Sequence, residues 1–357
     1  MLQSTQAKLL AWVLLCSATC SAVFIPEQSM IERRAFSNFR TATTGNGVCD
    51  SGQAAQLKVW IDDTVKLAQA AIDALASLET ATKPYEGQGQ IEYTARTADR
   101  LLGVDWQSGT TAEYTAAKQY FEGAKALANT GVVGARPAWI FCGDAFTERK
   151  QWSDMAYDIY GRDVPNPNKN NQPMLLSEVG DFNGWRTRNT VPYWIPAMQR
   201  YAFSRPGVLD PGVQGKQAGA ICTNADKNPL AVTSYNVNSW PIITICSPTN
   251  KSPPGDAFTA FPHDNITEVP LVTGSSLDRH RPGSATMLHE FMHATRPRGA
   301  THDRANNALA CANAADRTIP RDAPECAALF AVAMWLQADS AKKGNPHHFW
   351  STHAVKV

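Results

Sequence analysis

Two histidines and a glutamate towards the C-terminal end of the chain have the spacing of a catalytic metal site. They form the motif His289-Glu290-Phe291-Met292-His293, of the H-E-x-x-H type. A spacing of four on a helix stacks both imidazoles on one face, where they can bind one Zn²⁺ ion at about 2.0–2.1 Å. Glu290 lies about 100° around the helix, a position that suits a general base acting on water beside the metal. The motif therefore predicts zinc-dependent hydrolysis rather than a coincidental histidine pair.

The residues around the motif predict the helix that carries it. Ser284 is a candidate N-cap, and Pro297 ends the helix one turn after His293. The residues that point away from the ligand row are suited to the core: Leu288, Phe291, Met292 and Thr295. We therefore expect one helix with a core face and a metal face.

A catalytic zinc needs a third protein ligand and one position left open for water. The metzincin continuation of the motif is absent, because Arg296 and Gly299 occupy the positions of its glycine and its histidine. A thermolysin-like arrangement would use Glu325, 32 residues after His293. A nearer carboxylate is Asp303, ten positions after His293, far enough for the chain to loop back to the metal. Spacing alone leaves both carboxylates as candidates.

The stretch at 299–307 resembles the deuterolysin-type aspzincins, which are secreted fungal zinc endopeptidases. Their signature pairs H-E-x-x-H with a following G-T-x-x-D-x-x-Y-G, and Gly299 and Asp303 match its first glycine and its aspartate. The resemblance implies that Asp303 is the third zinc ligand. Ala300, Asn306 and Asn307 depart from the signature, in place of its threonine, tyrosine and final glycine. The family tyrosine assists by hydrogen bonding to the reacting centre, and an asparagine amide can donate a hydrogen bond but lacks a phenol.

The resemblance extends in patches from residue 49 to residue 331. The helix after Cys49, the strand at 243–246 and the helical stretch after Cys311 are similar to parts of the family domain, whereas 133–240 matches none of it. The resemblance implies a zincin-like α+β domain over residues 49–357, mostly helical, with a small sheet and the zinc site at 284–307. It also implies that residues 240–246 belong to a sheet whose edge strand pairs with the substrate backbone.

Hydrophobic periodicity predicts the elements that position this site. Apolar residues recur every three or four positions after Cys49 to about residue 78, and again from 111 to 128, which indicates two helices. Short apolar runs at 138–142 and 240–246 predict strands, and 165–173 is rich in turn residues. Helical pattern returns from residue 284 to the end of the 330s. Four tryptophans are expected to pack in the core rather than to line a cleft: Trp152, Trp185, Trp194 and Trp240.

The other histidines have weaker claims to a function. His302, beside Asp303, could replace the missing electrophile or compete as a ligand, although a solvated loop histidine is the commonest case. His280 is expected in a surface loop. The C-terminal histidines are expected in a solvated tail: His347, His348 and His353.

Composition restricts the partners and the compartment. The 357 residues include 33 Lys or Arg and 32 Asp or Glu, a balance that disfavours a nucleic-acid binder. Lys8, an apolar run and small residues up to Ala22 predict a signal peptide at 1–22, too short to span a membrane. An extended arm, or a short pro-segment cut after Arg34, follows at 23–48.

The cysteines and two sequons agree with secretion. Six of the eight cysteines lie beyond the signal peptide, which suggests three disulfides among 15 possible pairings. The sequons at Asn250 and Asn265 are typical of glycosylated surface loops. We therefore expect a secreted, extracellular protein.

These patterns predict a secreted zinc endopeptidase. One Zn²⁺ per chain would bind His289, His293 and Asp303, and Glu290 would act as general base on protein or peptide substrates. We expect a monomer without nucleic acid and without stable membrane association. The alternative is a secreted binding protein or effector on a decayed peptidase scaffold, in which Asn306 ended turnover. A structural protein without metal would require the motif to be accidental.

Overall fold

The computed structural model describes residues 38–43, 47–143, 146–204, 222, 230–236, 238–246, 265–268, 271–297, 300–350 and 352–356. These residues belong to one compact unit, which runs from Arg33 to Val357. The predicted signal peptide at 1–22 lies outside the described residues, as do most of the arm at 23–48 and the sequon at Asn250. Helices and several small sheets make this unit an α+β structure.

Three helices form the N-terminal part of the unit: α2 (Ser51–Thr80), α3 (Gln90–Leu102) and α4 (Thr111–Thr130). Asp50 begins α2 and Thr110 begins α4, each with a capping box that satisfies two backbone N–H groups. Both helices are predicted by the sequence. Helix α3 is not, because small or polar residues make up most of its buried face: Thr94, Ala95, Thr97, Ala98, Leu101 and Leu102.

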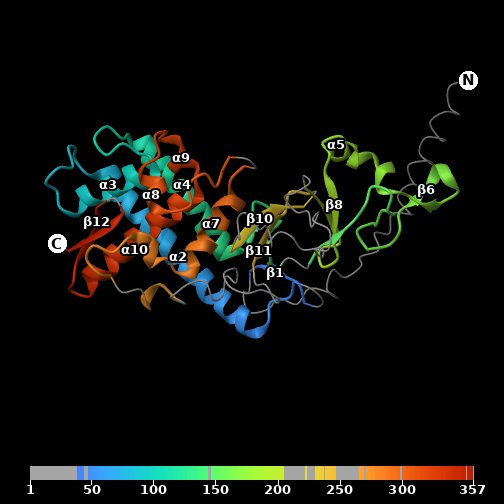
Figure 1. Ribbon diagram of the computed structural model, residues 1–357, viewed down its shortest axis with the longest axis horizontal. Helices are drawn as coiled ribbons and strands as arrows, with labels where there is room; N and C mark the ends of the chain where they lie inside the picture. Colours follow the sequence, from blue (N-terminus) through green and yellow to red (C-terminus); the bar gives the residue numbers. More distant parts are fainter. Residues whose placement is uncertain are drawn as a thin grey trace, which may run out of the picture. The chain divides into compact units, whose positions relative to one another are not determined.

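The largest sheet has four strands in the order β1 (Arg40–Thr41), β4 (Trp139–Cys142), β11 (Pro241–Ile245) and β10 (Ala231–Tyr235). The first three are parallel, whereas β10 is antiparallel to β11 and lies at the edge. The predicted strands at 138–142 and 240–246 are confirmed as β4 and β11. Both β10 and β11 pack against α7 (Gly283–Thr295), so this sheet supports the helix that carries the motif (Figure 1).

A second group of short elements has a hydrophobic cluster of its own. The strands β5 (Glu148–Arg149), β8 (Val191–Ile195) and β9 (Arg200–Ser204) form an antiparallel sheet. Trp194 is buried in this cluster, and Trp152 and Trp185 pack against it, as expected for core tryptophans. The remaining elements of the region are small: β2 (Val132–Val133), β3 (Arg136–Pro137), β6 (Pro165–Asn166), η1 (Pro167–Lys169), β7 (Gln172–Pro173), η2 (Leu176–Glu178), η3 (Gly180–Phe182) and α5 (Asn183–Arg186).

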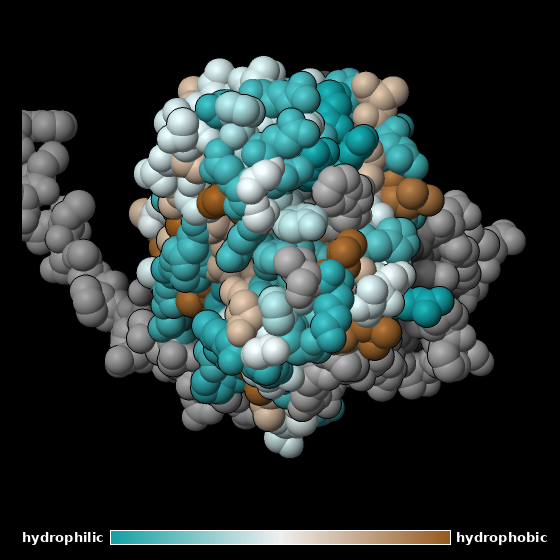
Figure 2. Space-filling view, turned by 90° about the vertical axis from the view of Figure 1, so that its left-hand side faces the viewer, coloured by the Kyte–Doolittle hydropathy of each residue, from teal (hydrophilic) through white to brown (hydrophobic). Residues whose placement is uncertain are grey.

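The C-terminal part is mainly helical. After α7 come α8 (Ala308–Ala312), α9 (Thr318–Asp322), α10 (Pro324–Lys342), and a hairpin of β12 (His347–Trp350) and β13 (His353–Lys356). The helices α2, α4, α7 and α10 pack against one another around the main hydrophobic core (Figure 1). The end of the unit that carries α3 and β12 has a mainly hydrophilic surface, on which hydrophobic residues are scattered singly (Figure 2).

Three histidines that were expected to be solvated are buried, so these predictions are wrong. His280 ends η5 (Leu277–His280), and its Nε2 lies 2.6 Å from Ser275 Oγ. His347 and His348 belong to the hairpin rather than to a tail, and the His348 ring stacks on Tyr93 of α3 with centroids 4.7 Å apart. The hairpin packs on α3 and α10, and helices distant in sequence therefore cover these polar residues.

Three disulfides join the six cysteines: Cys49–Cys142, Cys222–Cys246 and Cys311–Cys326. They confirm the expected number of disulfides and select one of the possible pairings. The first joins the start of α2 to β4, and the last joins α8 to α10. Within the described ranges, no helix is long and apolar enough to cross a membrane.

Candidate metal centre

Helix α7, which carries the motif, is held between the core and the largest sheet. It begins at Gly283 and, as predicted, ends just before Pro297. Ser284 lies inside the first turn instead of capping it, because the helix already begins at Gly283 and Pro282 is its N-cap. Gly283 is in close contact with Trp60. A Cβ added at Gly283 would lie 2.1 Å from Trp60 Cε2. The predicted core face is buried at Leu288, Phe291 and Met292.

The two motif histidines and Asp303 bring three potential ligand atoms together. His289 Nε2 lies 3.1 Å from His293 Nε2. Asp303 Oδ1 lies 3.2 Å from the first of these nitrogens and 2.9 Å from the second. In the part of the chain that the structure describes, this is the one cluster of histidine, cysteine and acidic side chains able to hold a metal ion. Asp303, ten positions after His293, therefore lies beside the helix, as the spacing allowed.

These three atoms fit a tetrahedral zinc site. Bonds of about 2.0–2.2 Å in such a site separate the ligand atoms by about 3.3–3.5 Å. The observed separations of 2.9–3.2 Å require only a small outward adjustment. The His289 and His293 side chains are mostly buried, whereas that of Asp303 is 59% exposed. The centre therefore opens to solvent beside Asp303, the most exposed of the three side chains.

Neighbouring carboxylates control the protonation of His289 in the metal-free protein. Burial disfavours the imidazolium, but hydrogen bonds to Asp303 and Glu325 outweigh burial and raise the pKa of His289 to about 10. Burial also acts against the charge of Asp303, yet hydrogen bonds from His289 and His293 hold its pKa well below the usual range. A metal ion that binds here must displace the proton of His289.

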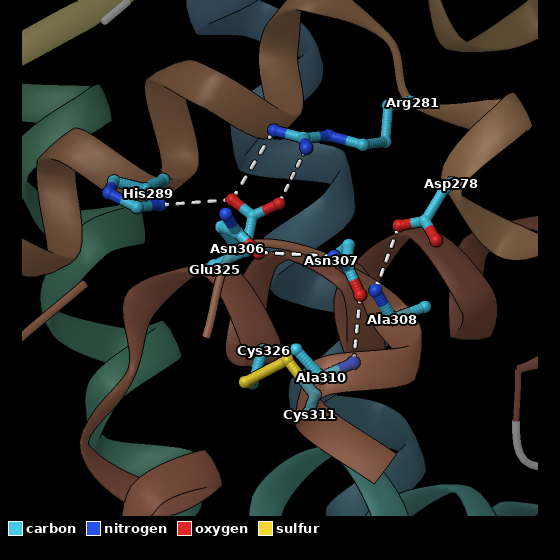
Figure 3. The surroundings of a disulfide bond; sticks show 10 residues. All are labelled: Asp278, Arg281, His289, Asn306, Asn307, Ala308, Ala310, Cys311, Glu325 and Cys326. Atoms are coloured by element: carbon cyan, nitrogen blue, oxygen red, sulfur yellow. Dashed lines mark hydrogen bonds and ion pairs between the residues drawn. A yellow bond between two sulfur atoms is a disulfide. The ribbon is translucent and has the colours of Figure 1, made fainter. Parts of the chain in front are cut away.

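Glu325, the other carboxylate that spacing allowed as a ligand, lies on the far side of His289. Its Oε2 is 3.2 Å from His289 Nδ1, the ring nitrogen that points away from Asp303. Figure 3 shows Glu325 between His289 and Arg281, whose guanidinium contacts both carboxylate oxygens. The geometry therefore favours Asp303 over Glu325 as the third ligand.

The edge strand and a loop hold the rest of the motif. The Glu290 side chain is 5% exposed, and Thr233 Oγ1 lies 2.7 Å from its Oε2 and 3.0 Å from its backbone oxygen. The Tyr235 hydroxyl donates to the backbone carbonyl of His293 at 2.6 Å, and Thr301 Oγ1 lies 2.7 Å from His293 Nδ1. Because Thr233 and Tyr235 both belong to β10, this strand positions the carboxylate beside the three potential ligand atoms.

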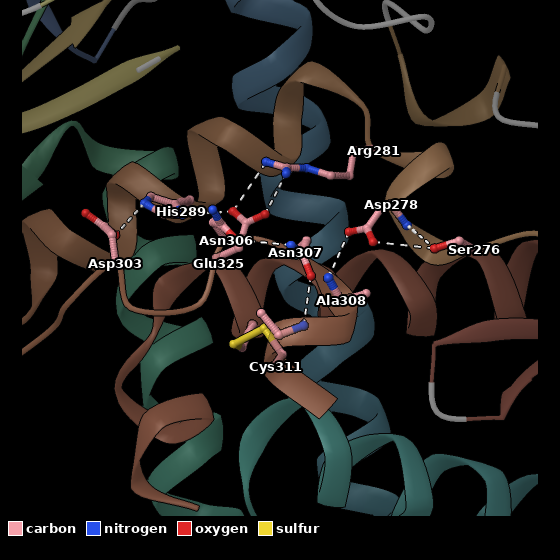
Figure 4. A network of polar contacts seen from close by, with 12 residues as sticks. Ser276, Asp278, Arg281, His289, Asp303, Asn306, Asn307, Ala308, Cys311 and Glu325 are labelled. Atoms are coloured by element: carbon pink, nitrogen blue, oxygen red, sulfur yellow. Dashed lines mark hydrogen bonds and ion pairs between the residues drawn. A yellow bond between two sulfur atoms is a disulfide. The ribbon is translucent and has the colours of Figure 1, made fainter. Parts of the chain in front are cut away.

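The loop that carries Asp303 is anchored where α8 begins. The side chains of Asn307 and Asp278 each accept a hydrogen bond of 2.8 Å from backbone N–H groups in the first turn of α8. Asn307 also donates its amide to Asn306 Oδ1 at 3.1 Å. Figure 4 shows this anchor beside the contact between Asp303 and His289. Asn306, at the position of the tyrosine in the aspzincin signature, thus contributes to the start of α8.

The structure brings together the four residues predicted for the site: His289, Glu290, His293 and Asp303. His302 is not part of the ligand group, and its backbone N–H donates to the Asp322 carbonyl at 3.2 Å. Sequence reasoning missed Thr233 and Arg281, which touch Glu290 and Glu325. A threonine in a strand and an arginine in a loop have no local pattern that marks them.

Comparison with known proteins adds no relative to this description. No protein-family model, no curated protein and no solved structure matches the chain.

Proposed function

We propose that this protein is a secreted zinc endopeptidase of the aspzincin type. The observation that carries the proposal is the cluster of two imidazole nitrogens and one carboxylate oxygen, all within 3.2 Å of one another, with the buried Glu290 carboxylate beside them. A pure metal-binding site has no need of that second carboxylate. Hydrolysis by a metal-activated water requires a base at that position.

The site residues have separate roles in the proposed reaction. A zinc ion bound at this centre would supply a Lewis acid that polarises a peptide carbonyl and acidifies water. His289, His293 and Asp303 would hold the ion. Glu290 accepts the proton of the attacking water and passes it to the leaving amine. Thr233 binds Oε2 of Glu290, while Oε1 lies 3.8 Å from His289 Nε2, on the side of the ligands.

The edge strand β10 is the proposed binding site for the substrate backbone. Within the described residues it pairs with β11 alone and ends the strand order of the sheet, the position at which an extended peptide would add as a further strand. The side chains of Thr233 and Tyr235 connect this strand directly to the motif helix. A peptide bound along β10 would therefore lie close to the metal ligands, as in the zincin-like fold that the resemblance implies.

The proposed compartment is extracellular. The three disulfides are typical of oxidising environments, and the expected signal peptide at 1–22 would direct the chain there. The sequon at Asn265 lies at the start of η4 (Ile266–Glu268), with Thr267 exposed. We propose a monomer that acts on protein or peptide substrates.

A secreted binding protein or effector on a decayed peptidase scaffold is the second candidate function. Asn306 favours it, because this residue replaces the family tyrosine and its side-chain oxygen is bonded to Asn307. Such a protein would bind zinc without hydrolysing peptides.

Hydrolysis of a diverse peptide mixture by the zinc-loaded protein, read by mass spectrometry, tests the proposal. The Glu290→Gln variant should keep its zinc and lose hydrolysis by a factor of about 10²–10⁴, the usual contribution of a general base. Glu79→Gln is a matched control, because Glu79 is a carboxylate only 15% exposed that pairs with Lys118 at 2.7 Å between α2 and α4.

The outcomes separate the two candidates. Cleavage by the wild type and by Glu79→Gln, but not by Glu290→Gln, would support the endopeptidase. Equal cleavage by wild type and Glu290→Gln would refute the mechanism. A zinc-loaded wild type that cleaves nothing would favour the binding protein and make Asn306 the first residue to restore to tyrosine.

A further inference from the structure

A carboxylate that the proposed reaction does not use lies behind the metal centre. The Glu325 side chain, at the start of α10, is only 6% exposed. Arg281 forms an ion pair with it, with Nη1 2.6 Å from Oε1, and donates a hydrogen bond from Nη2 to Oε2 at 3.3 Å. The same Oε2 lies 3.2 Å from His289 Nδ1. We propose that Glu325, held by Arg281, is a positioning residue that sets the tautomer and the ring orientation of His289 for metal binding.

The tautomer follows from the hydrogen-bonding capacity of the groups. A carboxylate that is paired with a guanidinium accepts hydrogen bonds and has no proton to donate. The contact with Glu325 therefore requires the proton of a neutral His289 to lie on Nδ1. The lone pair is then on Nε2, the nitrogen 3.2 Å from Asp303 Oδ1. His289 is thus presented to the metal in the form that binds through Nε2.

Arg281 makes a buried carboxylate possible at this place. An unpaired buried carboxylate is strongly unfavourable, whereas the charge of a guanidinium beside both oxygens compensates the lost hydration and restricts the orientation of the carboxylate. The position of Glu325 in the first turn of α10 adds a favourable interaction with the helix dipole. With Arg281 against both of its oxygens, Glu325 is held on the Nδ1 side of His289, away from the ligand atoms.

The segment that supplies Arg281 also anchors the loop of Asp303. Asp278, three residues earlier, accepts a hydrogen bond from the first turn of α8, which follows that loop. A disulfide joins α8 to the residue after Glu325 (Figures 3 and 4). Residues 276–281 therefore contact both Glu325 and the start of the helix that follows the Asp303 loop. In this way one segment fixes the position of Glu325 and that of Asp303, on the two sides of the His289 ring.

Zinc affinity is the primary test, measured on the full secreted chain by competition with a chromophoric chelator. The inference requires a metal at the centre and does not require peptide hydrolysis. Glu325→Ala should weaken zinc binding about 10- to 100-fold, the usual effect of removing such a partner from a metal-bound histidine. Glu325→Gln should lose less, because an amide oxygen can still accept from Nδ1. Glu79→Gln, which removes a similarly paired carboxylate elsewhere, should bind zinc as the wild type does.

A spectroscopic measurement distinguishes positioning from direct ligation and from general loss of structure. Long-range ¹H–¹⁵N NMR of the zinc-loaded, histidine-labelled wild type should show His289 protonated on Nδ1 and metal-bound through Nε2. Glu325→Gln should weaken this preference, and the Co²⁺ absorption spectrum should indicate an unchanged number of ligands. If Glu325→Ala does not fold, Glu325→Gln carries the test alone.

Two results would overturn the inference. One is zinc affinity and His289 signals that are unchanged in the Glu325 variants that fold. The other is a Co²⁺ spectrum that loses a protein ligand in those variants, which would make Glu325 a direct ligand. Weaker zinc binding by the variants, together with a wild type that cleaves no peptide, would refute the proposed function and leave this inference standing. Peptide cleavage by the wild type, together with unaltered zinc affinity in the Glu325 variants, would refute this inference and leave the proposed function standing.

Discussion

The contact between Thr233 and Glu290 yields a sharp prediction about the proposed general base. Thr233→Val replaces the hydroxyl by a methyl group of similar size, so the packing of β10 on α7 is preserved. The substitution removes the hydrogen bond of 2.7 Å to Glu290 Oε2 and the contact of 3.0 Å to the Glu290 carbonyl. The carboxylate then loses its contact with the edge strand, while the metal ligands are untouched.

The magnitude follows from the kind of bond that is removed. A hydrogen bond to a charged group contributes about 1.5–3 kcal/mol, and each 1.36 kcal/mol corresponds to about tenfold in rate. The upper limit is therefore a loss of about 150-fold in kcat/KM. Thr233 has a single hydroxyl hydrogen, which is shared between the carboxylate and the backbone carbonyl of Glu290. The bond to the carboxylate is therefore weaker than this limit, and we expect kcat/KM to fall about tenfold. Thr233→Ser keeps the hydroxyl and should retain most of the activity.

The assay is kcat/KM on a peptide identified from the mixture, with zinc content measured in parallel. Thr244→Val is the matched control, because Thr244 lies on the neighbouring strand β11, opposite Val232, and is fully buried. Its Oγ1 has no hydrogen-bond partner among the described residues, so its loss should leave activity unchanged. Full activity in Thr233→Val, or an equal loss in both variants, would refute a positioning role for Thr233.

Three further predictions concern the metal and the helix that carries it. Asp303→Ala should weaken zinc binding and alter the Co²⁺ spectrum through loss of a ligand; an unchanged spectrum would exclude Asp303 from the ligand set. Because the pKa of His289 is raised to about 10 in the metal-free protein, zinc must displace its proton at neutral pH, and affinity should increase as the pH rises towards 10. Calorimetry in buffers of different ionisation enthalpy should detect about one released proton per chain, and no release would contradict the assignment. Gly283→Ala should destabilise the protein to urea by about 1–3 kcal/mol, because the new Cβ would lie 2.1 Å from buried Trp60, whereas Gly184→Ala, with nothing within 4 Å, should not.

Several structural features follow from local sequence. The helices at α2 and α4 have regular apolar periodicity and capping residues at their starts, and both are predictable for that reason. The strands β4 and β11 are short apolar runs bounded by turn residues. The hairpin of β12 and β13 was missed, because its histidines are polar and become buried only through contact with α3 and α10.

The sequence by itself determined the pair of histidines on one helix face and the glutamate beside them. Helix geometry is local, so a spacing of four residues places His289 and His293 together in any fold that keeps α7 helical. The stop at Pro297 is equally local. The resemblance to the aspzincin signature indicated Asp303 as the third ligand. Spacing alone allowed Glu325 as well.

Only the tertiary structure decided which side of His289 each carboxylate occupies. Asp303 and Glu325 both lie close to the ring, at Nε2 and at Nδ1 respectively, and this difference separates a potential ligand from a positioning residue. Thr233 contacts Glu290 although it lies 57 residues earlier in the chain. The disulfides likewise join segments whose pairing the sequence does not indicate, such as Cys49 and Cys142. Contacts between distant segments depend on how whole elements pack, and the local pattern around each residue does not contain that information.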